Sequence, residues 1–269
     1  MSQRLAISTL AAVLISAAAC ASAFEGDGQV LGLPGGQVHL WCDGEQQPAI
    51  VFLAALGGDD TLVPIAEELA DEATTCFYYR PGDGDTNPPA EPRTAAADAA
   101  DLHELLAAAD IDTPAVLVAH SYGGLVAVIA GAEHPDDIAG VVLVDGSQPD
   151  AEAQMYTVMT DAERAYFDGE KANFPHVDWP TSLDQARDAV PGFPDIPLTV
   201  ITATRSFLDP CQEQLPCEEL QAIWIEAQEA YAAMTPDAIH VLAETSHYVH
   251  NDDPDLVLAE IRGLLGRVD

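Results

Sequence analysis

A serine stands at an unusual corner of this sequence. In VLVAHSYGGLVAVIAG, residues 116–131, an apolar run leads into Ser121, and a second apolar run suited to a helix follows. The order strand, sharp turn, helix exposes the hydroxyl at the end of a sheet and sets helix N-terminal N–H groups beside it. This pattern predicts that Ser121 is a nucleophile for acyl transfer, with backbone N–H groups available to stabilise an oxyanion.

The residues around Ser121 favour a nucleophile over a simple polar cap. A tight turn at the serine crowds the positions two residues away on either side, so both must be small, and here they are Ala119 and Gly123. A serine hydroxyl is weakly nucleophilic alone, and it needs a base and a third group that orients the base. The rest of the chain must therefore supply a histidine and a carboxylate.

The elements that would position these groups alternate along the chain. Apolar runs predict strands at 36–44, 48–56, 74–80, 115–119, 140–146, 197–203 and 238–244, the first of them an outer strand. Helical spacing predicts helices after residue 58 and at 94–109, 121–134, 217–234 and 254–267. This alternation predicts an α/β fold with a mostly parallel sheet covered on both faces. The polar, proline-containing stretch 147–195 interrupts it, and we expect a helical cap over one end of the sheet.

Four motifs occur in one order on the expected elements. They are FLAALGG (52–58), YYRPGDGDT (78–86), AHSYG (119–123) and SHYVHNDDPDLV (246–257). With these motifs the mature chain resembles the α/β-hydrolase family over nearly its whole length. Two positions depart from the usual pattern, since Tyr79 replaces an aspartate and Ala119 replaces the commoner glycine. The resemblance implies an α/β-hydrolase fold and a serine hydrolase of the esterase or lipase kind.

The resemblance also implies which histidine is the base. His247 follows the last predicted strand, where the family has its catalytic histidine, and His250 is the alternative three residues on. We expect His250 to pack locally. His120 flanks the serine but should point away from the turn and support the site from behind. A His-x-x-His pair without a third ligand is a weak metal signal, so we expect neither a metal nor a cofactor.

Two aspartates compete for the role of the third catalytic group. Asp145 ends the predicted strand GVVLVDG, at the sheet edge where catalytic groups gather in parallel sheets. Asp209 follows the next strand in a looser loop, beside Cys211. We favour Asp145 as the acid; its alternative role is to cap the end of the strand.

The oxyanion hole would use two backbone N–H groups, those of Tyr122 and Leu56. Arg80 lies at a strand end before a proline, which indicates a structural role. Four aromatic residues of the 147–195 stretch could line an acyl pocket or form the core of the cap: Tyr156, Phe167, Phe174 and Trp179.

The charge balance excludes some partners. The chain has 9 basic and 45 acidic residues, a net charge of −36, and a single lysine, Lys171. Such a surface repels nucleic acid and anionic membranes. Two origins of the excess acid stay open: a need for solubility, as in high salt, or a general compositional bias.

The first residues have the pattern of a secretory signal peptide. One arginine precedes an apolar run, and ASA at 21–23 resembles a cleavage site, which predicts a signal peptide at 1–23 and a mature hydrolase domain at 24–269. The alternative is a lipoprotein anchored through Cys20. No other segment is long and apolar enough to predict a membrane span.

Cleavage after residue 23 leaves four cysteines, which in an exported protein suggests two disulfides. Cys211 and Cys217 are close in sequence and favour a local bridge, which leaves Cys42 to pair with Cys76.

These features together predict a secreted serine hydrolase that cleaves small carboxylic esters through an acyl-enzyme. A peptidase, a perhydrolase or haloperoxidase activity on the same triad, and a non-catalytic binding protein that kept the fold are the alternatives. The sequence predicts no particular oligomeric state.

Overall fold

The computed structural model of the chain describes residues 28–58, 60–84 and 86–268. The predicted signal peptide and Cys20 lie outside these residues. Within them, no helix has both the length and the apolar character that crossing a bilayer requires.

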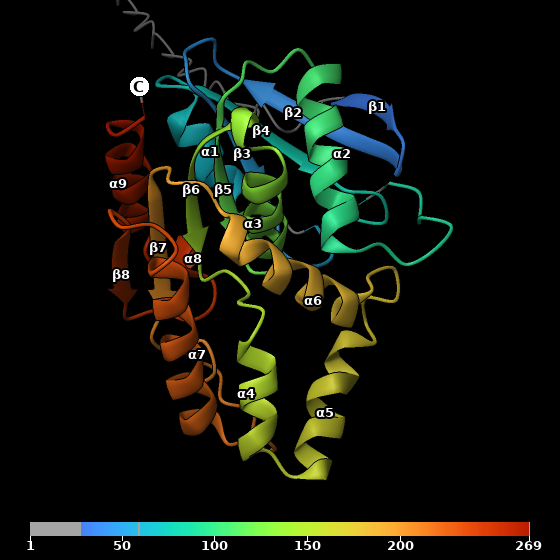
Figure 1. The fold of residues 1–269 in the computed structure, drawn as a ribbon, viewed down its shortest axis with the longest axis vertical. Coiled ribbons are helices and arrows are strands. Elements are labelled where there is room, and N and C mark those ends of the chain that lie inside the picture. The colour runs from blue at the N-terminus through green and yellow to red at the C-terminus, as the bar shows by residue number, and fades with distance from the viewer. Residues whose placement is uncertain (1–27, 59, 85, 269) are drawn as a thin grey trace, which may run out of the picture.

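One sheet of eight strands organises the described chain, in the order β1-β2-β4-β3-β5-β6-β7-β8 (Figure 1). Its strands are β1 (Gln29–Leu33), β2 (Gly36–Asp43), β3 (Ala49–Leu53), β4 (Thr74–Tyr79), β5 (Ala115–His120), β6 (Ile138–Val144), β7 (Leu198–Ala203) and β8 (Ile239–Ala243). Neighbouring strands in the series β4-β3-β5-β6-β7-β8 are parallel, whereas β2 pairs antiparallel with both β1 and β4. The parallel strands therefore place their carboxyl ends along one edge.

Helices fill the connections between the strands. They are α1 (Val63–Leu69), α2 (Ala95–Ala108), α3 (Gly123–Glu133), α4 (Ala151–Val158), α5 (Asp161–Lys171), α6 (Trp179–Ala189), α7 (Cys217–Ala232), α8 (Val249–Asp252) and α9 (Pro254–Leu265). Two short 3₁₀ helices lie at Pro135–Asp137 and Val190–Gly192.

The central strands are buried on both faces because they are continuously apolar. In β5, Leu117 and Ala119 pack into the core beneath α2 and α3, whereas Val116 and Val118 pack into the core beneath α1 and α9. Successive side chains of a strand point to opposite faces, so an uninterrupted apolar run is what a sheet covered by helices on both sides requires. The mostly parallel α/β sheet predicted from the sequence is confirmed.

The stretch between β6 and β7 is helical. It forms α4, α5 and α6, and Figure 1 shows α4 and α5 extending beyond the end of the sheet. Helix α5 begins with a capping box in which Thr160 and Glu163 satisfy each other's backbone N–H groups. The insertion is anchored by an isolated parallel bridge between Arg93 and Val177.

Three local features differ from the sequence prediction. The strand predicted at the outside of the sheet, β2, is second from the edge, because β1 pairs along its outer side. The sequence pattern does not reveal β1, because this strand is short, mostly exposed and contains a glycine, Gly32. The short helix α8 was also missed.

Both predicted disulfides are present. Cys42 and Cys76 face each other across β2 and β4, with an S–S distance of 2.04 Å. Cys211 and Cys217 are bridged at 2.08 Å and close the loop that precedes α7. The second bridge therefore lies near the carboxyl end of β7, on the same edge as Ser121.

Candidate active site

The turn after β5 has the strained geometry that its sequence predicts. Ser121 adopts φ +51°, a left-handed conformation that costs a non-glycine residue about 1–3 kcal/mol. A Cβ atom at Gly123 would lie 2.4 Å from the carbonyl oxygen of Leu53, so only glycine lets α3 start this close to β3. Helix α3 then runs directly from the serine into the core.

A second strained turn packs against the first. Asp145, just after β6, adopts φ +46°. The amide of Ser147 donates to the carbonyl oxygen of Ser121 at 2.8 Å, and a Cβ atom on Gly124 would lie 3.0 Å from the Cα of Gly146. This close backbone packing fixes the aspartate turn beside the serine turn.

Asp145 is fully buried and saturated with hydrogen bonds. Its Oδ1 accepts from the amide of Ala203 at 2.9 Å and from the Trp224 indole at 2.7 Å. Its Oδ2 contacts the Ser206 hydroxyl at 2.5 Å and His247 Nδ1 at 2.6 Å. These four contacts offset the cost of burying a carboxyl group, and one of them is to an imidazole.

The structure thus brings Asp145 to His247. Asp209, the alternative acid, is half exposed and pairs with Arg205 at 2.7 Å. Among the described residues, no hydrogen bond joins the Ser121 hydroxyl to the His247 ring, and such contacts are often long before substrate binds.

His120 lies behind the site, where sequence analysis expected it. It is fully buried, its Nε2 is 3.1 Å from the carbonyl oxygen of His247, and the two rings are 4.7 Å apart. Burial, reinforced by the neighbouring His247 and His250, holds the pKa of His120 well below its ordinary value. A neutral His120 can donate Nε2–H to that carbonyl and so fix the histidine loop against β5.

His250 packs locally, as expected. Its Nε2 lies 2.8 Å from the hydroxyl of Thr61, and its ring stands edge-on to His120 at 4.6 Å. Burial lowers the pKa of His250 to about 4, so this imidazole is neutral over most of the pH range in which proteins are stable.

Arg80 holds the loop that contains Leu56. It donates to the carbonyl oxygens of Ala54 and Ala55 at 2.9 and 2.5 Å, and to Asp83 at 2.8 Å. Its guanidinium also lies 5.0 Å from the centre of the Tyr122 ring. One buried side chain therefore ties this loop to the residue that follows Ser121, in line with the structural role expected for it.

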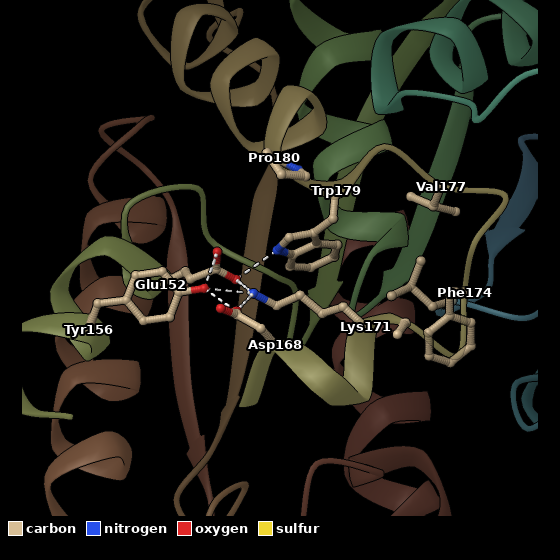
Figure 2. Close-up of a pocket in the computed structure, with 10 residues that line it drawn as sticks. Glu152, Tyr156, Asp168, Lys171, Phe174, Val177, Trp179 and Pro180 are labelled. Carbon is tan, nitrogen blue, oxygen red and sulfur yellow. Dashed lines mark hydrogen bonds and ion pairs between the residues drawn. The ribbon is translucent and has the colours of Figure 1, made fainter. Parts of the chain in front are cut away.

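A cavity of about 510 Å³ opens beside Leu56 and under the insertion (Figure 2). Three of the four aromatic residues singled out in the insertion line it, namely Tyr156, Phe174 and Trp179. Trp179 lies 6.1 Å from the Tyr122 ring, which connects the cavity to the serine turn. Phe167 does not line it and packs edge-on against Tyr156 at 6.3 Å.

One group of metal-capable side chains occurs in the described ranges: His103, His134 and Asp137. The two imidazole rings are stacked 4.1 Å apart and nearly parallel, so their nitrogen lone pairs do not converge on one point. The group precedes β6 and therefore lies at the opposite edge of the sheet from Ser121.

Comparison with known proteins agrees with this architecture. The model of the "Alpha/beta hydrolase family" matches residues 30–260. This chain belongs to the alpha/beta hydrolase family. It is also 24% identical over 216 residues to the uncharacterized protein YqjL of Bacillus subtilis (strain 168), covering 80% of this chain and 82% of that protein.

Solved structures show the same alpha/beta hydrolase fold. Est816, described as an N-acyl homoserine lactone degrading enzyme, matches with a TM-score of 0.65 and 16% identity, covering 87% of this chain and 99% of its own. The enol-lactonase from Burkholderia xenovorans LB400 matches with a TM-score of 0.64 and 20% identity, covering 88% of this chain and 100% of its own.

Two residues of this alpha/beta hydrolase were missed by sequence reasoning, Ser206 and Trp224. Both bind the Asp145 carboxylate, but they come from the loop after β7 and from α7. Nothing local distinguishes Trp224 from an ordinary core tryptophan on a helix. Only the position of α7 against the end of β6 reveals its contact.

Proposed function

We propose that this alpha/beta hydrolase is an exported serine hydrolase that cleaves carboxylic esters through an acyl-enzyme. Ser121 is the nucleophile, His247 the base, and Asp145 the group that orients and stabilises the protonated base. The 2.6 Å contact between His247 Nδ1 and Asp145, beside a serine in a strained turn, is the observation that supports this proposal most strongly.

In the proposed reaction, His247 takes the proton of Ser121 while the hydroxyl oxygen attacks the ester carbonyl. The backbone N–H groups of Tyr122 and Leu56 stabilise the oxyanion, and each such donor is worth about 3 kcal/mol. His247 then protonates the departing alcohol, and water hydrolyses the acyl-enzyme by the same route. The insertion α4–α6 acts as the cap that shields this chemistry.

Lactones are cyclic esters and require the same chemistry, and both solved structures compared above are named for lactone-degrading activity. They therefore belong among the test substrates. Export is proposed because the chain holds two disulfides, which persist in oxidising compartments.

A fluorophosphonate probe tests the proposed nucleophile directly. We expect it to label the wild-type protein stoichiometrically and to leave Ser121→Ala unlabelled, while His247→Ala labels slowly. The same variants should lose about 10⁴-fold or more of kcat/KM on p-nitrophenyl esters. A wild-type protein that is folded and remains unlabelled would contradict the proposal and favour a non-catalytic binding protein.

A further inference from the structure

The cavity beside Leu56 has two chemically different walls (Figure 2). The apolar wall contains Leu56, Ala172, Phe174, Val177, Trp179 and Pro180. The polar wall consists of Glu152 and Tyr156 from α4 with Asp168 and Lys171 from α5, and we call these four residues the polar wall below.

The Lys171 ammonium is held by the other three residues of the polar wall. Its Nζ lies 2.5 Å from Glu152 Oε2, 2.9 Å from Asp168 Oδ1 and 3.0 Å from the Tyr156 hydroxyl oxygen. Two of its three N–H donors form hydrogen bonds to Asp168 and Tyr156, and the ion pairs with Asp168 and Glu152 already balance its charge. The only lysine of the chain therefore does not offer a binding site for a substrate carboxylate.

The surroundings of this ammonium are those of a cation site. It lies 4.9 Å from the centre of the Phe167 ring and 5.4 Å from that of Tyr156, in addition to its two carboxylate partners. Aromatic faces combined with carboxylates are how proteins bind quaternary and primary ammonium groups. Here the site is filled by a side chain of the protein itself.

Glu152 is held in place from the other side as well. The Trp179 indole donates to its Oε2 at 2.7 Å, and the Tyr156 hydroxyl lies 3.1 Å from its Oε1. Burial, reinforced by the neighbouring carboxylates of Asp168 and Glu152, raises the pKa of Tyr156 far above its ordinary value, so its hydroxyl stays protonated. The polar wall therefore carries two negative charges, on Glu152 and Asp168, and one positive charge, on Lys171. Arg164 lies 5.9 Å from the Tyr156 ring but does not line the cavity.

We propose, on the basis of the esterase function above, that this cavity receives an uncharged, apolar acyl group and that Lys171 fills an ammonium site within it. A substrate carboxylate placed here would face the like charges of Glu152 and Asp168 in a partly buried site, which is unfavourable. A substrate cation would find its partners already occupied. Removing the Lys171 charge should empty the site for a cationic group.

The test uses three p-nitrophenyl esters of equal chain length that end in a tert-butyl, a trimethylammonium or a carboxylate group. We expect the wild-type kcat/KM for the tert-butyl ester to exceed both others by at least about tenfold. In Lys171→Met, which keeps the apolar stem and removes the terminal ammonium, the ratio of trimethylammonium to tert-butyl ester should rise at least about tenfold. Adding Glu152→Gln should abolish this rise. Each ratio is measured on one variant, so partial unfolding cancels.

A matched control is Glu170→Gln, which removes a charge from an exposed position next to Lys171 and should leave all ratios within about twofold. A binding readout that does not need turnover is Trp fluorescence during titration with tetramethylammonium, which should saturate for Lys171→Met and not for wild type.

The outcomes separate the two proposals. Equal turnover of the carboxylate and tert-butyl esters by the wild type, or unchanged ratios and no tetramethylammonium binding in Lys171→Met, would overturn the cavity assignment alone. A folded wild-type protein that neither reacts with fluorophosphonate nor cleaves any of the esters would overturn the esterase function, and the acyl-group assignment with it.

Discussion

The indole of Trp224 donates to the carboxylate of Asp145 across 2.7 Å, although 79 residues separate the two in sequence. Trp224 lies on α7 and belongs to the apolar cluster that also contains Met155 and Met159 of the insertion. The proposed catalytic acid is therefore hydrogen-bonded to a residue of the cluster that joins α7 to the insertion. Because Asp145 is fully buried, its orientation depends on such fixed donors rather than on water.

Trp224→Phe tests this contact. The substitution keeps most of the apolar volume and removes the indole donor, while Ala203 and Ser206 still bind the carboxylate. We expect kcat/KM on a p-nitrophenyl ester to fall about tenfold, because the carboxylate orients His247 less well. Trp41→Phe is the control, because it makes the same chemical change on β2, toward the other end of the sheet from β7. It should leave kcat/KM within about twofold. Equal losses in both variants would show that the Trp224 contact has no specific role.

The choice of acid is tested by Asp145→Asn against Asp209→Asn. Asparagine at 145 removes the charge that stabilises the imidazolium and favours the wrong tautomer of His247, so kcat/KM should fall about 10³–10⁴-fold. Asp209 is half exposed and binds only Arg205 among its described contacts, so its variant should keep nearly full activity. Loss of turnover in Asp209→Asn alone would reverse the assignment.

The elements around the site could be predicted because their signals are local. Val116 to Ala119 form a continuous apolar run. The small residues that the tight turn at Ser121 requires lie within the five residues 119–123. The competition between Asp145 and Asp209 could not be decided in this way. It depends on which strand end faces the loop of His247, and that is a property of the whole sheet.

The polar wall of the cavity was also beyond sequence reasoning. Glu152, Asp168 and Lys171 look like ordinary surface charges of two amphipathic helices. They become a partly buried cluster only because side chains from α4 and α5 reach one another beside Trp179 (Figure 2). Pairing across a helix interface of this kind has no sequence period that would reveal it.

The backbone contact at Gly123 predicts a cost for any side chain there. In Gly123→Ala the new Cβ would lie 2.4 Å from Leu53 O and 3.0 Å from Ala54 O, so α3 or the Leu56 loop must move. We expect a loss of about 1–3 kcal/mol in the free energy of unfolding, measured in urea, and a fall in kcat/KM. Gly263→Ala is the control. It lies in α9 with no atom near its Cβ, and it should stabilise by about 0.5–1 kcal/mol. Equal stability of the two variants would contradict the argument.

The buried histidines predict a pH dependence of stability. The pKa of His250 is lowered to about 4 from an ordinary value of 6.5, so below pH 6.5 the unfolded chain binds a proton that the folded chain does not. The contribution of neutral His250 to the free energy of unfolding is therefore fully present above about pH 6.5. It is lost as the pH falls toward 4, by about 3 kcal/mol in all. His120, whose pKa is also lowered, adds a change of the same sign.

His250→Gln isolates this effect because a glutamine amide can keep the contact with the Thr61 hydroxyl without titrating. Urea unfolding of wild type should show a free energy about 2 kcal/mol lower near pH 5 than near pH 7 from His250 alone, and the variant should lack that part of the slope. The comparison is made above pH 5 because the many carboxylates titrate below it. His103→Gln, at a half-exposed position, serves as the surface control. Parallel slopes in wild type and His250→Gln would show that burial of His250 does not oppose its protonation.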